Sequence, residues 1–221
     1  MKFKDVEIEW LHHDCFRITC KKIKIYTDPY KVLNRYNDAD LILITHDHYD
    51  HLDKESIKKL ICDKTIIIAP KDCEGLLSDF KNQKVLVSPD EIKIIKEITI
   101  KTVPSYNVNK FREKGAVFHP KEKGNVGYIF IIDNVRVYLA GDTDNIQEMK
   151  NFRTDIALLP VSGVYVMTPE EAAEAAIIIN PEIVVPMHYG SGIGTEKEAQ
   201  KFKRLLENKI RVEVLSPIDK S

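Results

Sequence analysis

Residues 45 to 51 concentrate metal-ligand side chains in one short segment. The sequence there is THDHYDH, with three histidines and two aspartates directly after the apolar run LILI. If the chain stays extended past that run, His46 and His48 point the same way, because strand side chains alternate with period two. A turn after them can bring Asp50 and His51 to the same cavity. The spacing therefore predicts two metal ions, with His46 and His48 on one and Asp50 and His51 on the other.

Two distant segments also end a predicted strand in a ligand-type residue. VYLAGD ends at Asp142 and IVVPMH ends at His188. Either residue alone would be an ordinary strand-end side chain. A ligand role is favoured for both because the first cluster needs further ligands. In α/β sheets, binding sites also form at the ends of the central strands, where both residues are expected to lie. We expect Asp142 to bridge two cations and His188 to be a ligand.

The elements that must position these residues are short strands. Runs such as Val6, Ile8 and Trp10 alternate with period two, which suits strands packed on one face. LILIT, TIIIAP and IALLP are continuously apolar and suit strands buried on both faces. Sheets with both kinds of strand need helices to cover them, so the chain is expected to be α/β (α+β).

Helices are predicted where capping residues precede a helical pattern. Thr168 and Thr195 each precede a glutamate at the third helical position, and helix 169–179 is expected to stop at Asn180-Pro181. Asp53 can cap a helix over residues 54–62. A fourth helix is expected over residues 72–80.

Composition limits the classes of protein that fit. The chain has 221 residues, 43% of them hydrophobic, and one large domain over residues 1–221 is expected. Its net charge of −1 gives no general attraction for nucleic acid or anionic membrane. No apolar run reaches the length of a bilayer span or of a signal-peptide core, so a cytoplasmic protein is expected. The four cysteines show no C-x-x-C spacing and are expected to be reduced.

The motifs together resemble the metallo-β-lactamase fold superfamily of metal-dependent hydrolases. The residues that carry this resemblance are Thr45, His46, His48, Asp50, His51, Gly141, Asp142, Pro186, Met187 and His188. WLHHDCFRI, YTDP and LLPVSGVYVMTPEEAAEA further resemble the branch that includes ascorbate-6-phosphate lactonase-like and N-acyl-phosphatidylethanolamine phospholipase D-like proteins. The resemblance runs from about Val6 to Val214. It implies a four-layer αββα sandwich with the metals at one rim between the two sheets.

One departure from that superfamily concerns a ligand. Its members usually place another metal-binding histidine after a strand between the two motifs, whereas this chain has Tyr106 and Asn107 there. His119 is the one histidine of that interval. Three alternatives follow: His119 reaches back as a ligand or general acid, Asn107 is a weak oxygen ligand, or one metal site is incomplete. Tyr106 and Asn107 are also candidates for binding substrate.

The expected function is hydrolysis of a small molecule. Imidazole and carboxylate ligands suit a divalent metal; two zinc ions are expected, with manganese or iron as alternatives. His48 argues against the redox-active di-iron relatives, in which a glutamate replaces that histidine. Zinc lowers the pKa of bound water to about 7, so a metal-held hydroxide could attack an ester, lactone, amide or phosphodiester bond. Asp50 would orient the hydroxide or accept its proton, and His119 or Tyr106 would serve the leaving group.

Two other classes stay open. A metal-stabilised ligand-binding protein would keep the fold without turnover, as an incomplete ligand set would favour. A nuclease ranks last, because the near-neutral charge gives no basic surface for nucleic acid. The expected partner is a small-molecule substrate, and a homo-oligomer is possible.

Overall fold

The computed structural model describes residues 1–219, which form two compact units. The first unit comprises Met1–Ser88 with the C-terminal residues from Leu215, and the second comprises Pro89–Val214. Each unit contains one seven-stranded sheet. The mixed α/β class predicted from the strand and helix patterns is confirmed. The single domain over residues 1–221 stays a prediction.

The sheet of the first unit follows the chain order. Its strands are β1 (Lys2–Phe3), β2 (Val6–His12), β3 (Cys15–Cys20), β4 (Ile23–Thr27), β5 (Leu41–Leu43), β6 (Ile66–Pro70) and β7 (Gln83–Val87). Strands β1 to β4 pair antiparallel, and β4 to β7 pair parallel. The carboxyl ends of β4 and β5 therefore lie at one edge of this sheet, and the segments that follow them, Asp28–Tyr30 and Thr45–His51, leave from it.

The sheet of the second unit has the order β16-β15-β14-β13-β12-β9-β8. Its strands are β8 (Ile92–Ile95), β9 (Ile98–Pro104), β12 (Val126–Ile132), β13 (Val135–Leu139), β14 (Ile156–Pro160), β15 (Ile183–Met187) and β16 (Arg211–Val212). Strands β13, β14 and β15 are parallel neighbours. Asp142, Ser162 and His188 follow them in turn, so the sheet order brings these three residues to one edge.

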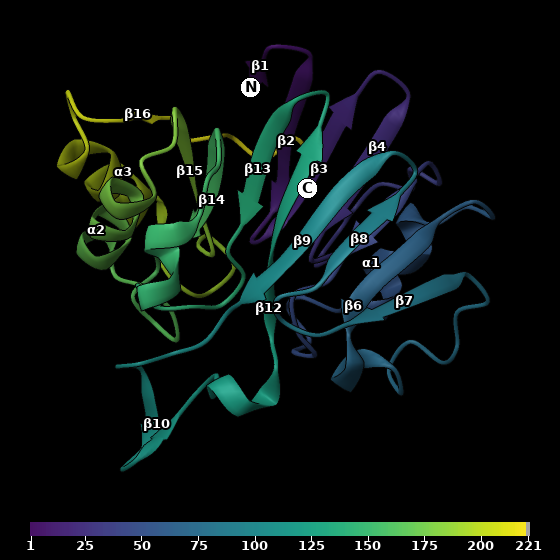
Figure 1. Cartoon of the computed structure of the whole chain (residues 1–221), viewed down its shortest axis with the longest axis horizontal. Helices are drawn as coiled ribbons and strands as arrows, with labels where there is room; N and C mark the ends of the chain where they lie inside the picture. The colour runs from purple at the N-terminus through teal and green to yellow at the C-terminus, as the bar shows by residue number, and fades with distance from the viewer. Residues whose placement is uncertain (220–221) are drawn as a thin grey trace. The chain divides into compact units, whose positions relative to one another are not determined.

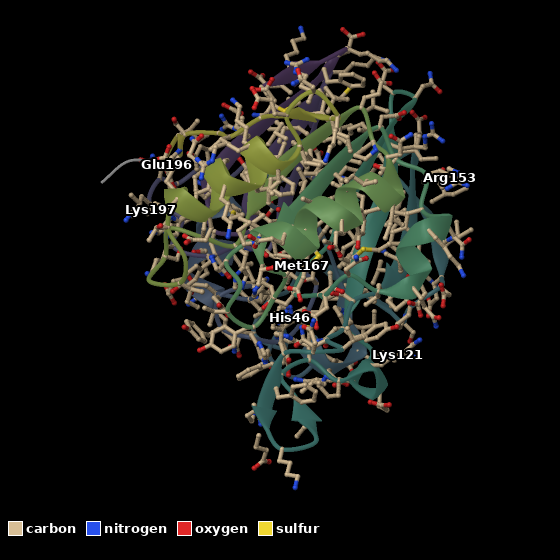
Figure 2. The ribbon with its side chains drawn as sticks, turned by 90° about the vertical axis from the view of Figure 1, so that its left-hand side faces the viewer. His46, Lys121, Arg153, Met167, Glu196 and Lys197 are labelled. Carbon is tan, nitrogen blue, oxygen red and sulfur yellow. The ribbon has the colours of Figure 1, made fainter. Side chains whose placement is uncertain are left out.

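Three α-helices begin where the capping residues predict. Asp53 caps α1 (Lys54–Leu60), Thr168 caps α2 (Pro169–Ile179) and Thr195 caps α3 (Glu196–Leu205), the last two with complete capping boxes. Helix α1 buries Ile57 and Leu60 in the core of the first unit, together with β5 and β6 residues. Figure 2 shows α2 and α3 lying side by side, with Met167 and Glu196 labelled near their beginnings.

The helix predicted over residues 72–80 is wrong. A single 3-10 turn, η1 (Lys71–Cys73), is followed by hydrogen-bonded turns. No side chain caps η1, and Gly75 lies inside the expected span. Glycine costs about 1 kcal/mol in a helix relative to alanine, so a short uncapped segment does not propagate.

A long connection between β9 and β12 carries a small hairpin, β10 (Phe111–Glu113) with β11 (Ala116–Val117), which projects from the second unit's sheet (Figure 1). Two further 3-10 turns are η2 (Lys121–Lys123) and η3 (Gln147–Asn151). Over residues 1–219, no helix has the length and apolar character needed to cross a membrane. The four cysteines are free thiols, as predicted.

Candidate metal centre

Histidine rings gather at one edge of the first unit's sheet. The ring centroid of His46 lies 4.0 Å from that of His51 and 4.5 Å from that of His48. His13 joins them, 5.6 Å from the His51 ring, and its Nε2 atom lies 3.5 Å from Oδ2 of Asp50. The structure therefore brings the four predicted ligands of this unit together and adds His13 to them.

A buried carboxylate, Asp28, organises this cluster. Its Oδ1 accepts the backbone N–H of Thr45 at 2.7 Å, its Oδ2 accepts the Thr45 hydroxyl at 2.7 Å, and Oδ2 lies 2.9 Å from Nδ1 of His51. The Thr45 hydroxyl also lies 3.0 Å from Nδ1 of His46. Burial raises the pKa of the Asp28 carboxyl, while its contacts with His51 and Thr45 act to lower it. Because both imidazoles are held through Nδ1, the nitrogen of each that can bind a metal is Nε2.

The second unit supplies a carboxylate between two imidazoles. Oδ1 of Asp142 lies 3.2 Å from Nε2 of His188, and Oδ2 lies 3.4 Å from Nε2 of His119. All three side chains are buried. A carboxylate whose two oxygens face two different histidines has the geometry to bridge two cations. This is the role that the sequence predicts for Asp142.

Both of these histidines are also held through Nδ1. The His188 Nδ1 lies 3.0 Å from the hydroxyl of Ser162, and the His119 Nδ1 lies 2.9 Å from Oδ1 of Asn107. Four of these imidazoles thus share one pattern, in which Nδ1 contacts a polar group of the same unit: His46, His51, His119 and His188. That pattern fixes the ring orientation of metal-binding histidines in proteins.

Asn107 uses its whole amide within the protein. Its Oδ1 also accepts the backbone N–H of His119 at 2.9 Å, and its Nδ2 donates to Asp144 at 3.2 Å and to the carbonyl of Tyr165 at 2.9 Å. His119 is only 1% exposed and lies beside Asp142. The structure therefore places the His119 ring beside Asp142 and the Asn107 amide on its other side.

Tyr106 points its hydroxyl at another residue of the second unit. The hydroxyl donates to Oε2 of Glu148 at 2.9 Å, and the Lys121 ammonium, 4.8 Å from the Tyr106 ring centroid, donates to Oε1 of Glu148 at 2.7 Å. Burial, and then the contact with Glu148, raise the pKa of the Tyr106 hydroxyl. Substrate binding by Tyr106 and Asn107 stays a prediction.

Several cluster residues adopt backbone conformations that side chains disfavour. Asp28, His13 and His188 have φ values of 33°, 53° and 60°. Positive φ is uncommon for residues other than glycine, and such strain concentrates at functional sites because the surroundings must hold it. Three of the positive-φ residues other than glycine thus lie in the two clusters, and others, such as Lys4, Lys21 and Asn134, lie elsewhere in the chain.

Four supporting residues were missing from the predicted ligand set: His13, Asp14, Asp28 and Ser162. The Asp14 Oδ2 atom lies 3.8 Å from Nδ1 of His51. The sequence did contain a signal for the first three, because they lie in WLHHD and YTDP, segments that carry the family resemblance. Asp28 also comes directly after a strand, and Asp142 lies close to the end of one. Ser162 gave no such signal, since its role depends on β14 lying between β13 and β15.

The fold and the two clusters define a class, the hydrolases of the metallo-β-lactamase superfamily. The family described as the beta-lactamase superfamily domain matches residues 7–188, a segment that contains both clusters, and the chain belongs to this family. Within it, the chain is similar to a UPF0173 metal-dependent hydrolase of Pyrococcus horikoshii, with 33% identity over 96% of this chain and 97% of the relative.

Solved structures agree with this assignment. A crystal structure from Parabacteroides distasonis, of a protein provisionally assigned as a metal-dependent hydrolase, is 33% identical with a TM-score of 0.82, covering 96% of this chain and 93% of that one. Igni18, a metallo hydrolase of the archaeon Ignicoccus hospitalis, shares the fold with a TM-score of 0.76 at 24% identity, covering 96% and 95%. The superfamily predicted from the motifs is confirmed, and the chain is a metal-dependent hydrolase of that superfamily.

Proposed function

We propose that the two clusters act together as the metal centre of a hydrolase that cleaves an ester, lactone, amide or phosphodiester bond in a small molecule. The proposed ligands are His46, His48, Asp50, His51, Asp142 and His188, with His119 added to them. Two zinc ions are the proposed metals, with manganese or iron as alternatives. The observation that carries the proposal is the position of Asp142, with one oxygen toward His119 and the other toward His188.

The donors fit a divalent transition metal. Neutral imidazole nitrogen and carboxylate oxygen are the ligands that zinc, manganese and iron accept, and no cysteine of residues 1–219 belongs to either cluster. The contacts at Nδ1 with Asp28, Thr45, Asn107 and Ser162 are the second layer that a metal-binding histidine needs. A divalent cation held there supplies Lewis acidity and acidifies a water molecule enough to attack at neutral pH.

The protein's own residues then have separate tasks. Asp50, whose Oδ2 faces His13 at 3.5 Å, is the proposed group that orients the attacking water and accepts its proton. We assign His119 to the ligand set rather than to the general acid, since its Nε2 faces Asp142 as that of His188 does. In this assignment His119 takes the place of the histidine that the superfamily usually carries near Tyr106 and Asn107.

A ligand-binding protein without turnover is the competing function. The missing histidine favoured it, whereas the 3.4 Å distance between Nε2 of His119 and Oδ2 of Asp142 supports the hydrolase. A nuclease finds no support in the net charge of −1.

Metal counting together with a hydrolysis panel tests the proposal. Purified protein loaded with zinc should hold about two equivalents per chain and turn over at least one generic lactone, ester or phosphodiester. Asp50→Ala should lose turnover by about 100-fold or more, as expected when a group needed for proton transfer is removed, while keeping its circular dichroism spectrum. One tightly held ion with no turnover across the panel would favour the binding protein instead.

The same experiment tests whether the two clusters serve one centre. His46→Ala belongs to the first unit and Asp142→Ala to the second. If the clusters act together, each substitution should lower the metal content and abolish turnover. Retention of two ions by either variant would show that its cluster is not part of the centre.

A further inference from the structure

Two tyrosines lie beside the histidine cluster of the first unit. The ring centroids of Tyr30 and Tyr49 are 5.9 Å apart with an interplanar angle of 77°, and the Tyr30 ring lies 5.6 Å from that of His13. His13 in turn faces Asp50 at 3.5 Å. A series of ring contacts therefore leads from the exposed Tyr49 through Tyr30 to His13, beside the candidate ligand Asp50.

The two rings differ in what surrounds them. Tyr30 contacts His12, His13 and Tyr49, and the Lys31 ammonium lies 5.0 Å from its centroid. Tyr49, by contrast, is 71% exposed, although it stands between His48 and Asp50 in the chain. Tyr30 is therefore placed to support the ring of Tyr49, whereas Tyr49 itself exposes most of its surface to a molecule that approaches from solvent.

The support under Tyr49 is held firmly. The segment that carries Tyr30 begins at Asp28, which bonds Thr45 and His51, and the carbonyl of Pro29 accepts the backbone N–H of Asp53, the cap of α1. Both Asp28 and Lys31 have positive φ, at 33° and 48°. A segment held by such contacts keeps Tyr30 in place, so Tyr49 can pack against it with less loss of conformational entropy when a ligand binds.

We infer that Tyr49, supported by Tyr30, is a specificity-determining residue that stacks against a flat aromatic or heteroaromatic ring of the substrate. The inference rests on the proposed function, because the reacting bond must then lie at the neighbouring ligands. Since Tyr49 is the chain neighbour of His48 and Asp50, the ring is attached to the reacting group directly or through a few atoms. The substrate class is thus a ring-bearing ester, lactone, amide or phosphodiester.

Matched substrates with a flat and a puckered ring test this inference. The probes are the methyl esters of benzoic and cyclohexanecarboxylic acid, and the methyl phosphodiesters of phenol and cyclohexanol. The measured quantity is the ratio of kcat/KM for the aromatic probe to that for its saturated partner. Intrinsic reactivity differs between partners, but it cancels when the ratio of a variant is compared with that of the wild type.

Tyr49→Ala should lower this ratio about two- to tenfold, the range of an aromatic pair in double-mutant cycles. Tyr49→Phe keeps the ring and should keep the ratio, and Tyr30→Leu should lower it less than Tyr49→Ala does. Leu76→Ala, which removes another exposed apolar side chain of the same unit, is the matched control and should leave the ratio unchanged. An unchanged ratio in Tyr49→Ala would overturn the inference.

A binding measurement separates this inference from the proposed function. Calorimetric titration of the zinc-loaded protein with benzoate and with cyclohexanecarboxylate needs no turnover. Tyr49→Ala should weaken benzoate binding selectively, and an equal loss for both acids would overturn the ring preference. A protein that binds benzoate selectively through Tyr49 but hydrolyses nothing would contradict the proposed function and support the ring site.

Discussion

Oδ1 of Asn107 accepts the backbone N–H of His119 and lies 2.9 Å from the Nδ1 atom of the same residue. The backbone N–H of Asn107 donates to the carbonyl of His119 at 2.8 Å. One asparagine thus fixes both the position and the ring orientation of a histidine 12 residues away. With Nδ1 as the donor, Nε2 is the lone-pair nitrogen that faces Asp142.

Asn107→Ala should therefore weaken metal binding while leaving the fold intact. Loss of a group behind a metal ligand typically costs 10- to 100-fold in affinity, so a drop of about that size is expected. Zinc affinity is measured by competition with a chromogenic chelator. Asn109→Ala is the control, since Asn109 donates to Glu171 rather than to His119. Equal affinities of the two variants would contradict a positioning role for Asn107.

Asp28→Asn should act on the other cluster by changing a tautomer. When Nδ1 of His51 donates to this carboxylate, which lies 2.9 Å away, Nε2 is left able to bind a metal. An amide nitrogen at that place donates to Nδ1 instead, so the proton moves to Nε2 and blocks it. Metal content should fall by about one equivalent per chain, as measured by atomic emission. Asp40→Asn, at a buried aspartate that accepts the N–H of Lys24, should keep both ions.

Removal of the metal should lower thermal stability. A ligand that binds only the folded state stabilises it by about 3 kcal/mol at a free concentration 100 times its dissociation constant. Dialysis against a chelator should thus lower Tm, and added zinc should restore it in proportion to the logarithm of its concentration. The measurement is differential scanning calorimetry. In His46→Ala, added zinc should raise Tm less than it does in the wild type. An equal rise in Tm would mean that the stabilising ion binds elsewhere.

Acid should release the contact between α2 and the segment before β10. Glu171 accepts Lys110 at 2.7 Å, Asn109 at 2.6 Å and the N–H of Thr168 at 2.8 Å. Burial acts to raise the pKa of Glu171, but these hydrogen bonds outweigh it and hold the pKa below its usual value of 4.5. Because the folded-state pKa is the lower one, this stabilisation is present above about pH 4.5 and is lost as the pH falls through the folded-state pKa.

Glu171→Gln tests that pH dependence. Glutamine keeps the capping-box geometry but removes the charge, so a loss of about 1 kcal/mol in the free energy of unfolding is expected at pH 7. The difference in stability between wild type and variant should shrink as the pH falls below 4.5, measured by urea unfolding at several pH values. Glu174→Gln, on the exposed side of the same helix, should show little difference at any pH. If the difference in unfolding free energy between wild type and Glu171→Gln does not change with pH, the charge of Glu171 is not the source of the stabilisation.

Local signals in the sequence determined most of the elements. Period-two and continuous apolar runs marked the strands that the two sheets contain, because burial on one or both faces leaves its pattern in any sequence. Asp53, Thr168 and Thr195 marked the helix beginnings, since a cap satisfies backbone N–H groups only a few residues away. The helix predicted over residues 72–80 does not form, because a segment with weak helical propensity and no side-chain cap cannot offset the free-energy cost of helix nucleation.

The candidate ligands of the first unit could also be predicted from the sequence, because His46, His48, Asp50 and His51 are neighbours in the chain. Only the tertiary structure decided which distant groups contact the Nδ1 atoms of the clustered histidines. Asn107 behind His119, Asp28 behind His51 and Ser162 behind His188 are separated in the chain by 12, 23 and 26 residues. Hydrogen bonds of that kind depend on strand order and on the path of a loop, which no local pattern records.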